Sequence, residues 1–215
     1  MRNRTEYRTM KLFICVILTF VGAAMARADG FLQLSLHRDF QIIPRNEGIQ
    51  GLRLNLFDSR NTHLTGVDVG INNELESRLV GLQVGILNRV GAMEAIQLGL
   101  INRVGGCAVG LQIGLVNRVE GRLDGLQIGV WQRVDGDMGL AQIGLINSAQ
   151  RSHGLQVGVV NMAVHDAETQ IGLINIGADM SWLQIGLVNI CKNNNGLQVG
   201  IVNWSGGLRW PFNWK

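Results

Sequence analysis

The stretch Gly81–Asn88 reads GLQVGILN, and variants of this phrase return along the chain until residue 203. Full copies include GLQIGLVN from Gly110, GLQVGVVN from Gly154 and GLQVGIVN from Gly196. The residue that closes each phrase recurs every 14 or 15 residues: Asn88, Asn102, Asn117, Gln132, Asn147, Asn161, Asn175, Asn189 and Asn203. Self-similarity at a fixed period indicates a repeat protein built from small stacked units.

Two degenerate copies precede the regular ones. GLRLNLFD ends at Asp58, and VDVGINN ends at Asn73, which is again 15 residues later. Arg53 and Asp68 occupy the Gln position of these copies, and Asn55 occupies the second Gly position of the first one. Together with the regular copies they make eleven units, and we interpret the two irregular units as capping coils.

Alternation within the phrase predicts its secondary structure. Leu82, Val84 and Ile86 share one parity, whereas Gln83 and Gly85 share the other. A period of two predicts a β-strand with one apolar face. A Gly in every copy would destabilise a helix by about 1 kcal/mol each, whereas Val, Ile and Leu favour strands. The variable residues between phrases are rich in Gly, Asp and Asn, which indicates turns.

Two all-β architectures fit this pattern. In a parallel β-solenoid of about eleven coils of 14–15 residues, like residues stack on like and buried Asn amides form a ladder. The alternative is an up-and-down antiparallel β-barrel of the outer membrane, in which each unit is one strand. We favour the solenoid, because the period shows no two-unit alternation and aromatic residues make up only 6% of the chain.

The N-terminal segment has the features of a secretory signal peptide over residues 1–28. Four basic residues precede an apolar run from Leu12 to Met25, and Ala26-Arg27-Ala28 forms an A-x-A cleavage site. We therefore expect export to the cell surface, the periplasm, the outer membrane or the medium. The remaining chain divides into an N-terminal cap (29–50), the repeat domain (51–203) and an aromatic C-terminal cap (204–215).

Net charge and cysteine positions limit the classes of partner and of cross-link that are expected. The net charge is only +3, and part of it belongs to the signal segment, so no nucleic-acid partner is expected. Cys107 and Cys191 lie six repeats apart at different points of the repeat, which excludes a disulfide framework. We expect both to be small buried apolar residues.

The residue after the closing Asn yields one surface prediction. It is Arg in four consecutive units, then Ser148, and apolar in the last four. We expect the basic side chains to form a possible polyanion-binding column for lipid headgroups or an anionic envelope glycan, unless acids in the adjacent turns pair with them. By parity this column should lie beside Gln83 and Gly85, away from the apolar face. Its members are Arg89, Arg103, Arg118 and Arg133, and the possible apolar contact column, open to another surface protein, comprises Met162, Ile176, Ile190 and Trp204.

No motif in the sequence points to catalysis. The four histidines are scattered without ligand spacing, and neither a G-x-S-x-G turn nor a phosphate-binding GxxxxGK loop occurs. We therefore expect no enzymatic activity, no cofactor and no metal.

The units GLQIGLVN, GLQVGVVN and GLQVGIVN resemble those of a family of bacterial surface-repeat proteins built from GLQxGLxN phrases. The resemblance covers about residues 51–204. It implies a secreted or surface-located protein without an established activity, and it assigns no site residue. A structural or interaction protein of the bacterial envelope is thus the expected function, and a small outer-membrane barrel that acts as a pore or anchor is the alternative.

Overall fold

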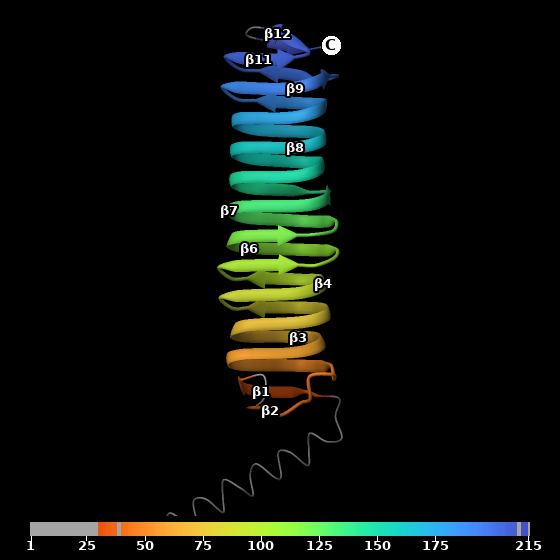
Figure 1. Cartoon of the computed structure of the whole chain (residues 1–215), viewed down its shortest axis with the longest axis vertical. Coiled ribbons are helices and arrows are strands. Elements are labelled where there is room, and N and C mark those ends of the chain that lie inside the picture. Colours follow the sequence, from red (N-terminus) through yellow and green to blue (C-terminus); the bar gives the residue numbers. More distant parts are fainter. Residues whose placement is uncertain (1–29, 38–39, 210–211, 215) are drawn as a thin grey trace, which may run out of the picture.

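The computed structural model describes residues 30–37, 40–209 and 212–214, which form a parallel β-solenoid (Figure 1). All paired strands belong to one sheet that winds around a single long axis. Within the described residues, no helix has the length and apolar character needed to cross a bilayer. The strands are β1 (Leu32–His37), β2 (Phe40–Gln41), β3 (Ile49–Val84), β4 (Leu87–Leu98), β5 (Ile101–Val104), β6 (Ala108–Val119), β7 (Leu123–Met138), β8 (Ala141–Ile185), β9 (Val188–Asn194), β10 (Leu197–Val199), β11 (Val202–Ser205), β12 (Gly207–Arg209) and β13 (Phe212–Trp214).

Successive repeats stack in parallel with identical positions in register. Asn88 lies opposite Asn102, which lies opposite Asn117, and the Gln, Arg and Val positions follow the same rule. The predicted solenoid is thus confirmed, and the antiparallel barrel is not the fold. About nine turns separate Asn73 from Asn203, so the number of turns differs slightly from the eleven predicted coils, which also include the unit that ends at Asp58.

Additional strands cover both ends of the stack. At the N-terminal end, β1 pairs in parallel with β3, with Gln33 opposite Arg53, and β2 turns back antiparallel to β1. At the C-terminal end, β12 and β13 pair antiparallel with β11 and β10, respectively. The predicted signal peptide, Trp210 and Pro211 lie outside the described residues.

The interior of each coil holds four side chains, so the core consists of four columns along the axis. Two columns are polar and contain the Gln and Asn of the repeat phrase, which are almost fully buried. The other two are mainly apolar. One of them includes Leu75, Val90, Val104, Val119, Val134, Ala149, Ala163 and Cys191, and the other includes Leu79, Met93, Ala108, Leu123, Met138 and Met180.

The orientation of the repeat phrase differs from the sequence prediction. Gln83 points into the core, whereas Val84 and Ile86 point outward, and Ile86 is 45% exposed. Two consecutive residues, Ile86 and Leu87, then face outward at a corner, so the alternation changes phase before Asn88. The arginine that follows Asn88 therefore lies on the same outer surface as Val84 and Ile86, and not beside Gln83 as parity had suggested.

Two ladders of side-chain amides run through the core in opposite directions. Each Gln amide donates to the Gln of the preceding coil at 2.6–2.9 Å, as Gln97 does to Gln83. Most Asn amides instead donate to the Asn of the following coil at 2.8–2.9 Å and also to a main-chain carbonyl there, as Asn88 does to Asn102 and Leu98. Stacked amides that satisfy one another make a polar core stable, and they hold the coils in register.

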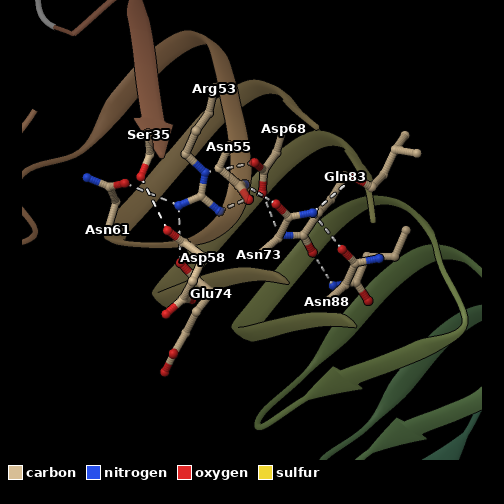
Figure 2. Close-up of polar contacts among 12 residues, drawn as sticks. Ser35, Arg53, Asn55, Asp58, Asn61, Asp68, Asn73, Glu74, Gln83 and Asn88 are labelled. Atoms are coloured by element: carbon tan, nitrogen blue, oxygen red, sulfur yellow. Dashed lines mark hydrogen bonds and ion pairs between the residues drawn. The ribbon is translucent and has the colours of Figure 1, made fainter. Parts of the chain in front are cut away.

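A buried ion pair begins the Gln ladder (Figure 2). Arg53 donates two hydrogen bonds to the Asp68 carboxylate, at 2.7 and 2.6 Å, and both side chains are fully buried. The remaining nitrogen of Arg53 reaches Asn61 at 3.2 Å, and Gln83 donates to Asp68 at 2.8 Å. The two residues that depart from the repeat thus compensate each other, and they supply the acceptor on which the ladder starts.

Two glycine positions of the phrase have distinct structural causes. Gly81 has a φ of 124°, a backbone conformation that favours Gly, at the corner before the strand. Gly129 lies against the preceding coil, where a Cβ atom would come within 1.9 Å of the Gly114 carbonyl oxygen. The second Gly of the phrase therefore leaves room for the close approach of the stacked main chains and for the Asn ladder beside them.

Candidate interaction surface

The outward positions of nine consecutive phrases form three adjacent apolar columns, which we call the uncharged face. All of its residues are Val, Ile or Leu, except for Trp131. The first column contains Val84, Leu98, Ile113, Ile128, Ile143, Val157, Ile171, Ile185 and Val199. The second contains Ile86, Leu100, Leu115, Val130, Leu145, Val159, Leu173, Leu187 and Ile201. The third contains Leu87, Ile101, Val116, Trp131, Ile146, Val160, Ile174, Val188 and Val202.

The uncharged face is open to solvent along the whole stack. Side chains of its middle column are 40–53% exposed, with Leu115 at the upper limit. None of the nine phrases from Leu82 to Asn203 contains Asp, Glu, Lys, Arg or His, because the charged residues of this region lie in the segments between phrases. The solenoid therefore has a charged side and an aliphatic side, and its polar amides point inward.

A shallow groove runs along the C-terminal part of the uncharged face. Gly172, Gly186 and Gly200 form its floor, and the outer side chains that flank each glycine form its walls. The groove has a volume of about 500 Å³. Its walls are Ile171, Leu173, Ile185, Leu187, Val199 and Ile201. Since no ionisable or hydrogen-bonding side chain lines this groove, it offers apolar contact and no acid–base chemistry.

The four predicted arginines form a column that borders the uncharged face. Arg89, Arg103, Arg118 and Arg133 stack in register on consecutive coils. Each is two residues beyond the third column of the face, and the side chains of Arg103, Arg118 and Arg133 are 43–48% exposed. The sequence therefore predicted correctly which residues align, although it assigned the column to the wrong side of the strand.

Acids in the turns pair with most of this column. Arg103 pairs with Glu120, while Arg118 and Arg133 both pair with Asp135, at 2.8 and 2.5 Å. Burial alone would raise the pKa of Asp135, but hydrogen bonds from Arg133 and Arg118, together with their charges, outweigh this effect and hold the pKa below its ordinary value of 3.8. Exposed pairs of this kind contribute about 0–1 kcal/mol each.

At its N-terminal end the arginine column meets a polar groove of about 420 Å³. The charged side chains that line it belong to Arg60, Glu74, Glu76, Arg89, Arg103 and Glu120. Equal numbers of basic and acidic groups give this groove no net charge, which weakens it as a binding strip for a polyanion on its own.

The predicted apolar contact column continues the arginine column toward the C-terminus. Ile176, Ile190 and Trp204 stack in register, and Trp204 is 50% exposed. Together with Met162 they line a groove of about 540 Å³ that also includes Lys192. The apolar surface is therefore one column wider in this half of the molecule than in the half that carries the arginines.

Other candidate groups are dispersed over the described part of the chain. Within it, no three His, Cys, Asp or Glu side chains converge as they would around a metal ion. Cys191 is buried as expected, but Cys107 is exposed, because it lies in a corner rather than at an inward position. His153 is half exposed and lies 3.8 Å from Glu168.

The uncharged face is the feature that sequence reasoning missed, because a period of two does not say which parity points inward. A usable signal was present in the repeats themselves. Gln is identical in the nine phrases, whereas the apolar positions exchange Leu, Ile, Val and Trp. A residue that must form a ladder with its own copies tolerates no exchange, whereas an outer apolar position requires only an apolar side chain.

Comparison of the chain with models of protein families, with curated proteins and with solved structures found no match.

Proposed function

We propose that this chain is a non-enzymatic structural or interaction repeat protein of the bacterial envelope, exported by residues 1–28. The A-x-A site after an apolar run supports export, and the GLQxGLxN phrases support a surface location through their resemblance to bacterial surface repeats. The coat of aliphatic side chains on one side of the solenoid supports a role in contact with another envelope component.

The uncharged face is the observation on which this proposal rests. The face is nine strands long, with strands spaced by about 4.8 Å, and about four residues wide. Treated as a flat rectangle, it has an area of roughly 500 Å². The largest contiguous apolar patch on a typical monomeric protein is about 300–600 Å² and is often functional, so a patch of this size is a candidate interaction site. The groove on this face contains no nucleophile, acid or base, which favours binding over catalysis.

Retention of the purified protein by washed bacterial envelopes tests the proposal. The chain is produced with its own N-terminal segment in a bacterial host, and mass spectrometry establishes the N-terminus of the purified product. The variant Leu115→Lys/Leu145→Lys places two charges on the face, at residues that are 53% and 52% exposed. Since the contact of one Leu contributes about 1–2 kcal/mol and a charge there adds a desolvation cost, retention should fall at least about tenfold.

Val109→Lys is the matched control for this experiment. Val109 is 46% exposed, but it stacks between Glu94 and Asp124 on the charged side of the solenoid. The control adds one Lys without touching the uncharged face, and its retention should equal that of the wild type. If the Leu115→Lys/Leu145→Lys variant were retained as well as the wild type, the face would have no role and the proposal would fail.

A further inference from the structure

We propose that the uncharged face docks on the surface of a phospholipid membrane, with its aliphatic columns among the acyl chains and the bordering basic side chains at the lipid phosphates. This inference deepens the proposed function and rests on it. The solenoid axis would lie parallel to the membrane plane, so that all nine phrases touch the same leaflet.

The chemistry of the face fits a hydrocarbon partner. Of its three columns, only Trp131 carries a side-chain hydrogen-bonding group. Interfaces with proteins are typically enriched in aromatic residues, Met and Arg, and they contain about one hydrogen bond per 100–200 Å². A uniform surface of Val, Ile and Leu recognises no particular shape or pattern of polar groups, which suits a fluid acyl-chain layer.

The main chain of the face is also suited to a nonpolar environment. Its N–H and C=O groups form hydrogen bonds to the adjacent coils, for example from Leu100 to Ile86 and from Leu187 to Leu173, each at 3.0 Å. Backbone groups that enter hydrocarbon must be paired within the protein, since no water is there to solvate them. Parallel stacking meets this requirement along the length of the face.

On the border that carries the arginine column, charge changes in a fixed order away from the face, and this order matches a membrane surface. The third apolar column comes first, Arg118 and Arg133 follow two residues later, and Glu120 and Asp135 lie two residues beyond these arginines. From the middle of a bilayer outward, hydrocarbon, phosphate and water follow one another in the same order. In the C-terminal half one coil has a basic residue farther out, since exposed Lys192 is two residues beyond Ile190. Basic groups beside an apolar stripe favour anionic lipids. Because Glu120 and Asp135 pair with Arg103, Arg118 and Arg133, most of the attraction to the membrane comes from the apolar columns.

Exposed tryptophans lie where such a surface would have its polar boundary. Trp204, in the column that borders the face, is 50% exposed, and Trp182, at the corner before Leu183, is 67% exposed. Indole rings favour the headgroup level of membranes, where the ring contacts acyl chains and its N–H contacts water. A second copy of this chain would require neither the basic border nor these rings.

Flotation with protein-free vesicles tests the inference. The purified protein is mixed with vesicles of zwitterionic phosphatidylcholine and anionic phosphatidylglycerol, and the fraction that floats gives the partition coefficient. The wild type should float, and the Leu115→Lys/Leu145→Lys variant should partition at least about tenfold more weakly, because Lys is disfavoured on a lipid-facing β-surface. Val109→Lys should partition as the wild type does.

Additional measurements distinguish lipid binding from self-association and from binding to another envelope component. Vesicles of phosphatidylcholine alone should bind less protein, and light scattering without vesicles should give the mass of one chain. A mass of two chains that falls to one in the Leu115→Lys/Leu145→Lys variant would overturn the inference in favour of self-association. Vesicles that bind nothing, while envelopes retain the protein through the same face, would overturn lipid docking and leave the proposed function intact. If the Lys variant were unfolded by circular dichroism, Leu115→Gln/Leu145→Gln would replace it.

Discussion

Replacing Gln132 by Asn should stabilise the solenoid, because Gln132 interrupts the Asn ladder. It occupies the Asn position between Asn117 and Asn147, and its amide donates to the Ile143 carbonyl instead of reaching Asn147. The side-chain oxygens of Gln132 and Asn147 are buried without a hydrogen-bond partner. One additional methylene group therefore leaves two acceptors unsatisfied in the core.

The expected gain follows from this geometry. In the regular coils each acceptor of this kind receives an amide hydrogen bond at 2.8–2.9 Å. Two restored bonds contribute about 0.5–1.5 kcal/mol each. The loss of one buried methylene costs about 0.8 kcal/mol. The Gln132→Asn variant should accordingly be more stable than the wild type by about 0.2–2.2 kcal/mol, with a central value of about 1 kcal/mol.

Urea unfolding followed by circular dichroism measures this difference. The midpoint should rise without a change in slope, since the exposed area on unfolding is nearly the same. Asn161→Gln is the reverse control, because Asn161 accepts from Asn147 and donates to Asn175 in an intact part of the ladder. It should lose about 2–6 kcal/mol through two broken bonds and overpacking. A Gln132→Asn variant no more stable than the wild type, beside a strongly destabilised Asn161→Gln, would refute the reasoning.

Two further predictions concern the first coils and the corners. Asp68→Ala should destabilise the fold by about 3–5 kcal/mol in urea unfolding, because it leaves the Arg53 guanidinium buried without its partner. The double variant Arg53→Gln/Asp68→Gln should recover most of this loss, because it extends the Gln ladder. Equal instability of the single and double variants would contradict this account. Gly129→Ala should lower the melting temperature, since its Cβ would lie 1.9 Å from a carbonyl oxygen of the preceding coil, but Gly105→Ala, whose Cβ would meet no atom closer than 3.8 Å, should leave it unchanged.

The stacking of the coils could be predicted from the sequence because the residues that specify it recur in every repeat. A constant step between closing Asn residues is compatible with parallel coils in register, and the amide ladder of Asn88 and its copies follows from that register. The additional N-terminal strand was not predicted as a repeat, because Gln33 precedes Arg53 by 20 residues instead of 15. The segment between these two positions includes the short strand β2, which has no counterpart in the repeats.

The orientation of the strands could not be predicted from alternation alone. Burial rules favour an apolar interior, but they do not consider how little space a coil of 14–15 residues encloses. Four side chains fill this space, and two of them are amides that satisfy each other along the axis. The corner at Ile86 and Leu87, where two apolar residues face outward in succession, also breaks the period of two on which the prediction rested.

Because the core is built from stacked amides, the residues that stabilise the fold differ from the residues proposed to bind a partner. Hydrogen bonds along the Gln and Asn columns and the buried apolar columns hold the coils together, and the outer residues such as Leu115 remain half exposed on a surface that the stack does not cover. Substitution of Leu115 by a polar residue should therefore change binding far more than unfolding. Exposure of an aliphatic surface over nine coils is also unfavourable in free energy in water, and it promotes aggregation. Contact with a partner of matching chemistry removes that cost, which is the physical reason to look for the function of this protein on its uncharged face.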